Sequence, residues 1–146
     1  MTLVAALRGL KSVPSDPSSP ALQAFESDLT PDDEANLKPY VYAVILMLPE
    51  NVNYEMLGGV QVIRATVDVV LIERGAGGKR PNRKNMAELR NQILRLAPLV
   101  DELVYDVPLL DPKLKYLSGT QPGASFQNNT ILTCTLRFQG RWAMKI

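Results

Sequence analysis

The chain contains no histidine and a single cysteine, Cys134, among its 146 residues. Without an imidazole there is no Ser–His or Cys–His pair, so those nucleophilic mechanisms are excluded. Zinc sites draw on histidine and cysteine, and one cysteine cannot supply them. A lone cysteine also makes no internal disulfide. Ser–Lys or carboxylate chemistry stays open by composition, but no spacing suggests it, so we expect no catalytic residue, metal or cofactor.

Long apolar runs are absent as well. The longest one extends from Val41 to Leu48, far short of the ~20 residues that cross a bilayer. The N-terminus lacks a basic start followed by a long apolar stretch, so we expect no signal peptide and synthesis in the cytoplasm. The formal net charge of +1 predicts no strong global attraction to nucleic acid or to an anionic membrane.

The two signs of charge are distributed unevenly along the chain. Residues 1–37 hold two basic and six acidic residues, a net charge of −4, whereas residues 74–95 hold seven basic and one acidic residue, a net charge of +6. Solvated surface is the commoner explanation of such runs. An acidic and a basic flank would also suit head-to-tail contacts between copies of the chain.

The length suits one domain, preceded here by an arm. Residues 1–20 are interpreted as a short helix, capped by Thr2, and a Pro/Ser linker from residue 12; residues 21–146 form a single domain. The helix is too short to be stable alone and needs a surface, in its own domain or on a neighbour. Its apolar side is Leu3, Val4, Leu7 and Leu10.

Periodicity predicts the elements of the domain. Residues 21–25 have partly helical character, and a short helix is expected from Thr30 as N-cap with Pro31 at its first position. Residues 39–49 read as a central strand between two prolines, and residues 51–59 as a loop. Residues 60–74 alternate as a strand with one core face and one polar face, and residues 82–97 carry a helical apolar stripe that ends at Pro98.

The C-terminal third contains one further clear strand. Residues 130–138 alternate, with Cys134 on the inward face, and Trp142 and Met144 continue that apolar face. A short strand is possible at 103–107, and residues 119–123 read as a turn. Strands before and after one long helix indicate an α+β fold: a mostly antiparallel sheet with one long helix packed on one face, plus the N-terminal helical arm.

The Gly-rich loop at residues 75–81 invites a phosphate-binding interpretation, which its residues do not support. A P-loop requires glycine where Glu73 stands and Ser or Thr where Arg80 stands. The basic residues that follow have no interleaved aromatic side chains for stacking on bases. Contact with an acidic protein surface is favoured over nucleic acid, with plain solvation as an equal alternative.

Arg64 and Asp68 share the polar face of the strand at 60–74, and Arg137 lies on the polar face of the last strand. Solvent exposure and an interface or pore-facing surface explain these residues about equally well. The candidate partner-interface residues are therefore Arg64, Asp68, Arg74, Lys79, Arg80, Arg83, Lys84 and Arg137.

The order of these elements resembles that of the tail terminator, or tail completion, proteins of tailed bacteriophages. The resemblance rests on an N-terminal helical arm, a strand pair near residues 40–48 and 60–73, a loop and helix over 75–97, and a last strand ending Leu136-Arg-Phe-Gln-Gly-Arg-Trp142. It covers residues 20–146 in layout and carries no sequence signature. The Pro/Ser arm is longer than that family leads one to expect.

The resemblance implies a virion protein that forms a ring, typically a hexamer, at the head-proximal end of the tail. Such a ring stops growth of the tail tube and joins it to the neck. Its partners would be copies of itself, the tail tube protein and neck or connector proteins, with no membrane and no sequence-specific nucleic acid. A neck connector or a tube subunit is the alternative, and a small module for a phosphorylated ligand is a third hypothesis.

Overall fold

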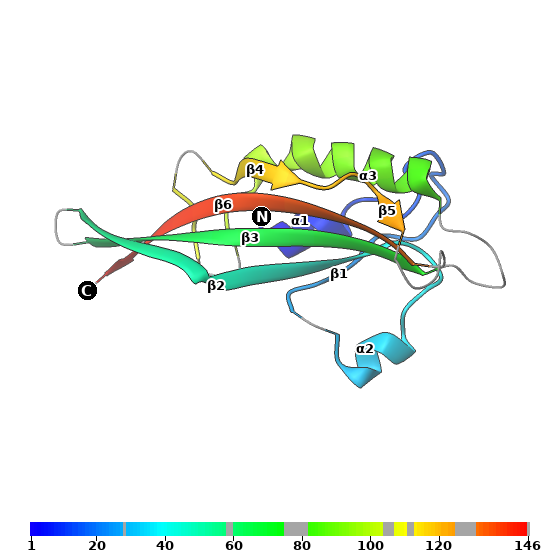
Figure 1. Cartoon of the computed structure of the whole chain (residues 1–146), viewed down its shortest axis with the longest axis horizontal. Helices are drawn as coiled ribbons and strands as arrows, with labels where there is room; N and C mark the ends of the chain where they lie inside the picture. The colour runs from blue at the N-terminus through cyan, green and yellow to red at the C-terminus, as the bar shows by residue number, and fades with distance from the viewer. Residues whose placement is uncertain are drawn as a thin grey trace.

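The computed structural model describes residues 1–27, 29–57, 60–74, 82–103, 107–110, 113–124 and 131–145. For residues 48–57, 60–61, 124 and 144–145 it describes the backbone alone. The fold is α+β, as predicted: a six-stranded sheet, antiparallel except for one short strand, with the longest helix on one face (Figure 1). Along its path the strand order is β1-β2-β3-β6-β4, and β5 pairs with β6.

Three long strands form the centre of the sheet. They are β2 (Tyr42–Leu57), β3 (Val60–Arg74) and β6 (Ile131–Lys145). β3 pairs with β6 along its whole length, from Val60 opposite Lys145 to Arg74 opposite Ile131. The short strands β1 (Gln23–Phe25), β4 (Lys115–Gly119) and β5 (Gly123–Ala124) lie at the two sides.

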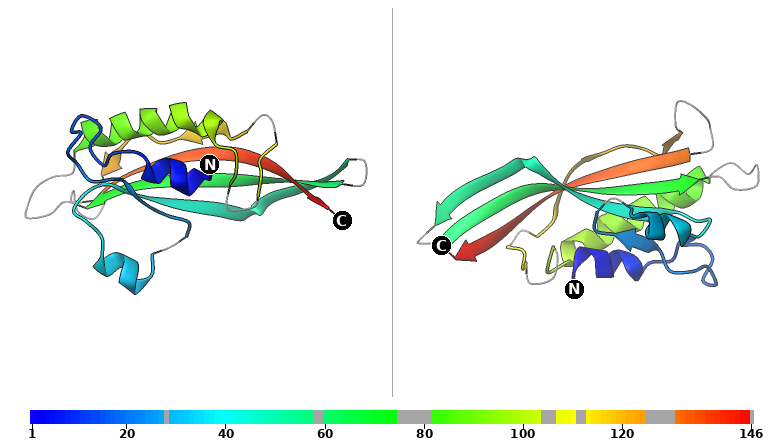
Figure 2. Two further views of the ribbon diagram at one scale, coloured as in Figure 1. Left: turned by 180° about the vertical axis from the view of Figure 1, so that it is seen from behind. Right: turned by 90° about the horizontal axis from the view of Figure 1, so that it is seen from below.

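The core lies between the sheet and two helices, α1 (Leu3–Arg8) and α3 (Arg83–Leu96). Both helices lie on the same side of the sheet (Figure 2). The alternation predicted for β3 and β6 is confirmed on this face, because Val67, Leu71 and Leu136 are fully buried there. Cys134 is also fully buried, as its inward position predicted.

The N-terminal helix belongs to this same core. Thr2 caps it, as predicted, by accepting a hydrogen bond from the Ala5 amide at 3.2 Å. Leu3 and Leu7 are fully buried in the cluster that includes the sheet and α3. The Pro/Ser segment is tied to α3, since the Asn85 side-chain amide donates to the Ser12 carbonyl at 2.9 Å. The arm therefore packs on its own domain.

The second helix, α2 (Pro31–Ala35), begins as predicted. Thr30 and Asp33 form a capping box, with hydrogen bonds of 3.0 and 3.1 Å between side chains and amides. None of its residues is buried, and in Figure 1 it stands apart from the sheet on the β1 side. The segment is held by Gln23, whose side chain bonds the backbone of Asn36 and Lys38.

Two sequence-based expectations were wrong. The partly helical stretch at 21–25 is strand β1, because it finds a parallel partner in β2. The loop expected at 51–59 is strand as far as Leu57; the register shifts between Leu48 and Asn53, which accommodates Pro49 on an open edge. The turn or loop predicted at 119–123 is present as the connection 120–122, but the sequence did not predict the strands on either side of it, β4 and β5, which pair with β6. The strand considered at 103–107 lies partly outside the described residues.

The predicted long helix is confirmed, with a different end. α3 begins after Asn82, whose side chain accepts from the Asn85 amide at 3.2 Å. It stops at Leu96 and continues as one 3-10 turn, η1 (Ala97–Leu99), that includes Pro98. A proline near the start of this short turn needs no amide bond, so the chain stays helical for three more residues.

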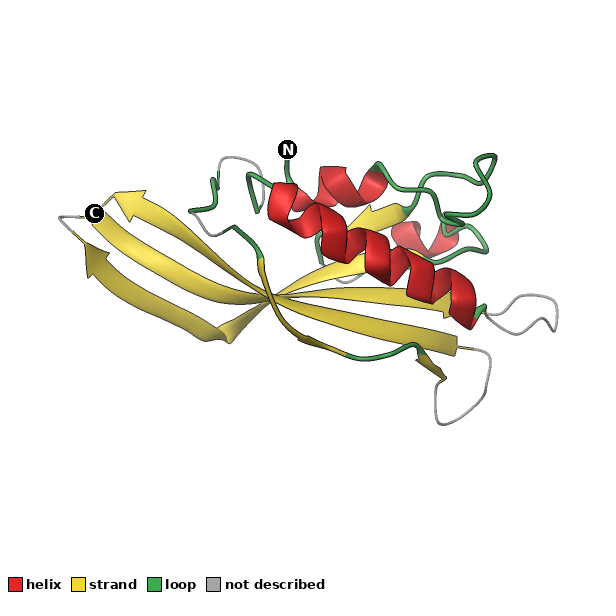
Figure 3. Ribbon diagram, turned by 90° about the horizontal axis from the view of Figure 1, so that it is seen from above, coloured by secondary structure: helices red, strands yellow, loops and turns green. Residues whose placement is uncertain are grey.

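Beyond the helices, the three long strands continue as an extension of the sheet (Figure 3). We define this extension as residues 48–57 of β2, 60–66 of β3 and 139–145 of β6, which begin at one rung where Leu48, Thr66 and Gln139 are paired. No described helix lies over it in Figure 3. The extension is the most distinctive feature of the shape, and the C-terminus lies at its tip.

Candidate assembly surfaces

The structure separates the candidate interface residues into three places. Asp68 and Arg137 lie mid-sheet on the face opposite α1 and α3, and Arg64 lies in the extension. Arg74, Arg83 and Lys84 lie near the junction of β3 and α3. Lys79 and Arg80, with the rest of the Gly-rich loop, lie outside the described residues. The candidates that can be placed therefore do not form one site.

Asp68 and Arg137 form a two-pronged ion pair. They are directly opposite in the β3–β6 register, and the guanidinium donates to both carboxylate oxygens at 2.9 and 3.0 Å. Asp68 is only 7% exposed, so the polar face predicted for β3 is not fully solvated here. Such a geometry is among the stronger charged contacts in proteins. Its evident role is to hold β3 and β6 together.

In the β3–β6 register Arg64 is directly opposite Arg141. It lies two residues before Thr66 on β3 and therefore on the same face of the sheet. Two like charges directly opposite destabilise a strand pair unless other groups compensate. Both arginines do have partners in the structure. This rung is therefore part of the packing of the extension, and it does not mark a ligand site by itself.

The start of α3 is already occupied by a negative charge. The Glu73 carboxylate accepts a hydrogen bond from the Asn82 amide at 3.1 Å, which joins the end of β3 to the helix N-cap. Burial raises the pKa of Glu73, while this hydrogen bond acts in the opposite direction. Arg83 donates to the Pro122 carbonyl at 3.4 Å. A phosphate at this helix start would meet the Glu73 carboxylate, which disfavours the ligand-binding alternative.

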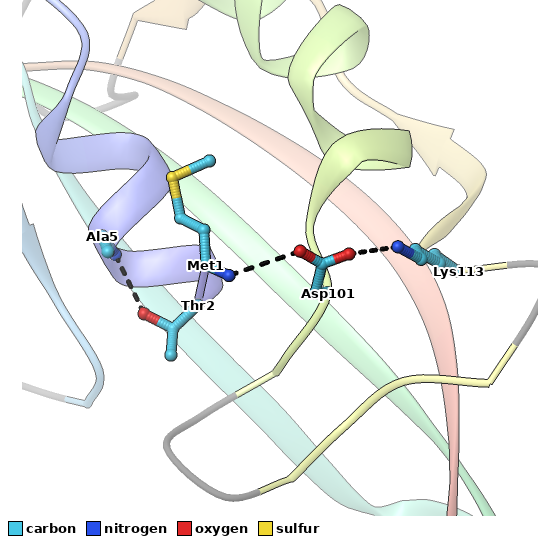
Figure 4. Close-up of polar contacts among 5 residues, drawn as sticks. All are labelled: Met1, Thr2, Ala5, Asp101 and Lys113. Atoms are coloured by element: carbon cyan, nitrogen blue, oxygen red, sulfur yellow. Dashed lines mark hydrogen bonds and ion pairs between the residues drawn. The ribbon is translucent and has the colours of Figure 1, made fainter.

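Another charged cluster joins the N-terminus to the segment after α3 (Figure 4). The Met1 amino group lies 3.4 Å from the Asp101 carboxylate, which also pairs with Lys113. Lys113, and then the amino group, hold the pKa of the Asp101 carboxyl below its usual value. The Met1 carbonyl accepts from the amides of Asp101 and Glu102. The cluster therefore ties the N-terminus to the segment after α3.

Three hollows open to solvent are formed by residues that the structure describes. One of about 280 Å³ is lined by Leu29 and Glu34 and by apolar residues on the outer face of β2 and β3. Two others, of about 270 and 360 Å³, lie near α2 and β1. Within the described ranges, no group of three or more acidic or cysteine residues could hold a metal ion. The 270 Å³ hollow brings together Glu34, Lys38 and Arg74, but all three hollows are open to solvent, unlike the enclosed pockets that usually bind small molecules.

Backbone edges are the other exposed feature, and the sequence did not indicate them. β1 covers only Tyr42–Val44 of β2, and no described strand pairs with that side of β2 from Met47 to Leu57. On the opposite side of the sheet, the outer side of β4 has no described strand partner. Every residue of β4 is exposed, including Tyr116 at 40% and Leu117 at 44%.

No family model matches the chain, and no curated protein matches it. In the part of the chain that the structure describes, no helix is both long enough and apolar enough to cross a membrane.

Proposed function

We propose that this protein is a structural subunit that assembles with copies of itself into a closed ring. The observation that carries the proposal is the presence of unlike open edges on opposite sides of one sheet, β2 from Met47 onward and β4. Unpaired edge groups are templates for another strand. Two different edges give head-to-tail contacts, which form a ring when the rotation between copies closes.

Within that class, we propose a tail terminator ring of a tailed bacteriophage. The support is the order of the elements, with an N-terminal helix, long strands before and after one long helix, and a last strand that ends the chain. In this role the ring caps the head-proximal end of the tail tube, stops its growth and joins the neck. Docking between subunits does this work, so the proposal needs no catalytic residue or cofactor.

Self-assembly is tested by measuring mass in solution over a wide range of protein concentration, alone and with purified tail tubes. We expect a discrete ring, alone or on tube ends. A chain that remains a monomer at every concentration and never co-purifies with tubes contradicts the proposal.

The place of the ring in the particle is tested by labelling the protein and imaging assembled tails. A terminator predicts label at the head-proximal end only, and tubes of uncontrolled length when the protein is withheld. Label along the whole tube would identify a tube subunit. Label in the neck, with tube length unchanged on withholding the protein, would identify a connector.

A further inference from the structure

Charge distinguishes the two open sides of the sheet. β2 from Met47 to Leu57 carries Glu50 and Glu55 and no basic residue, and we name it the acidic edge. On the other side, β4 carries Lys115 and no acidic residue. The neighbouring end of β6, from Gln139 to Lys145, is likewise basic. We name β4 and this end of β6 the basic edge; its open part is β4, because the Leu110 amide already donates to the Arg141 carbonyl of β6 at 2.8 Å.

Apolar exposure singles out β4 within the basic edge. Edge strands are commonly protected by short length, by charge or by a bulge. β4 has five residues, Lys115 and a register shift between Tyr116 and Ser118, and it nevertheless exposes the side chains of Tyr116 and Leu117. Tyr116 is held in place by an edge-to-face contact with Phe138 and by a hydrogen bond from Arg90 at 3.1 Å. β4 therefore presents a fixed apolar side chain, Tyr116, next to an open strand edge, and a partner strand would cover both.

Strand directions fix how the two edges can meet. β2 and β6 are both antiparallel to β3 and so run the same way, whereas β4 is antiparallel to β6. In a ring whose axis follows the strands, every copy keeps its strand direction. β4 of one copy and β2 of the next then run antiparallel, and antiparallel pairing is the slightly more stable geometry.

Height along the sheet supports the same pairing. β4 lies level with Leu136–Gln139 of β6, which are opposite Thr66–Val69 of β3 and hence Ile45–Leu48 of β2. The acidic edge starts at that level and continues into the extension. If neighbouring copies are shifted slightly along the strand direction, β4 of one copy lies beside the part of the acidic edge that follows Pro49 in the next copy. Such a shift between neighbours arises when strands tilt relative to the axis of a closed barrel.

From these observations we infer that the acidic edge of one copy pairs with β4 of the next, so that one sheet continues through the assembly. The partner is a second copy of this chain, because the chain itself supplies both complementary edges. The inference rests on the proposed self-assembly and specifies which surfaces meet in it.

Cysteine cross-linking tests the pairing directly. Leu117→Cys on β4 is mixed with a series of single variants that place cysteine at successive positions from Asn51 to Leu57. We expect disulfide-linked pairs only in mixtures, strongest at alternate positions because strand side chains alternate, and only where Cα atoms come within about 7 Å. Wild-type protein is a suitable background, because Cys134 is fully buried.

Leu99→Cys is the matched control, since Leu99 is 68% exposed but lies in η1, which belongs to neither edge. Linkage of Leu99→Cys at the same rate as Leu117→Cys would overturn the pairing. Disulfide-linked dimers formed by one β2 cysteine variant on its own, without the β4 variant, would also overturn the pairing, because they indicate a two-fold contact between two β2 edges. Discrete rings without any β4–β2 linkage would overturn this interface and leave ring assembly standing; a monomer without linkage contradicts both.

Charge reversal gives an independent test. Lys115→Glu should weaken self-association on the order of tenfold, and combining it with Glu50→Lys and Glu55→Lys should restore association. Equal weakening by Lys11→Glu, an exposed basic site between α1 and β1 and outside both edges, would show a general effect of net charge and contradict the pairing.

Discussion

Gly119 lies where β4 and β6 approach each other closely, with little room for a side chain. An added Cβ would lie 2.7 Å from the Tyr116 hydroxyl and 2.9 Å from the Thr135 carbonyl oxygen. The second contact is with backbone, which cannot move aside without disturbing the β4–β6 pairing. The close approach of these strands therefore depends on a glycine.

We expect Gly119→Ala to lower the free energy of unfolding by about 1–3 kcal/mol, as for other overpacked sites. Gly123→Ala is the control, because its nearest atom would be the Gln121 carbonyl oxygen at an ordinary 3.8 Å; its effect should stay within about 0.5 kcal/mol. Chemical denaturation measures both. Equal stability of the two variants would contradict the packing described for β4.

Cys134 shows a second effect at the residue scale. Burial raises the pKa of its thiol, although Arg90 and the hydrogen bond to Thr120 act in the opposite direction. Because the thiolate is the reactive form, we expect no reaction with a thiol reagent in the folded protein and full reaction in denaturant. Rapid modification of the native protein would show that the inward face of β6 opens readily.

At the scale of elements, α1 is a structural part of the domain. Leu7 is fully buried against the common core, so Leu7→Ala should cost about 2–5 kcal/mol of stability. Leu99→Ala removes the same atoms from an exposed position and should change stability by less than about 0.5 kcal/mol. A small loss for Leu7→Ala would mean that the N-terminal segment is a separate arm after all.

Glu73 couples β3 to α3 and predicts a pH dependence. Its pKa is raised in the folded state, so at neutral pH folding carries a cost of keeping this carboxylate ionised. Glu73→Gln removes that cost and should be more stable than wild type at pH 7.5 by up to about 1 kcal/mol, since the group is partly exposed.

The advantage of Glu73→Gln should shrink as pH falls through the folded-state pKa and vanish below the unfolded-state value, where both states are protonated. Urea denaturation at pH 7.5 and at pH 4 measures the difference. If the stability advantage of Glu73→Gln over wild type instead grew on acidification, the hydrogen bond from Asn82, and not burial, would be the main influence on the pKa of Glu73.

Several elements were predictable because their signals are local. Thr30, Pro31 and Asn82 act within one turn, and the alternation of β3 and β6 needs only a buried face. β1 and β4 were not predictable, because three or five residues become strand only when distant β2 or β6 is beside them. Pro49 normally ends a strand, and only an open edge with a register shift lets β2 continue past it.

The sequence could indicate which charged residues are candidates for an interface, but not how the fold arranges them. Charge alone selected Asp68 and Arg137, but their pairing depends on a register between residues 69 positions apart. Charge also selected Arg83, which the structure uses to hold the segment before β5. The open edges carry no residue signature, because their exposed groups are backbone and belong to every sequence.

For the whole molecule, the extension predicts how protection from solvent changes with assembly. Amides of β2 beyond Met47 that point away from β3 have no described strand partner. We expect these amides to exchange hydrogen quickly in the free chain and to become protected on assembly, whereas the β3 amides, between two strands, stay protected in both. Exchange measured by mass spectrometry tests this. Unchanged β2 protection in assembled protein would place the contacts elsewhere.

The position of α2 has a practical consequence. This helix contributes no side chain to the core, and its flanks are already fastened together by Gln23. Lengthening a surface loop costs little free energy, so a short peptide tag inserted after Ala35 should leave the melting temperature nearly unchanged. Bound by an antibody fragment, such a tag would mark each protomer in micrographs and let the copies be counted one by one.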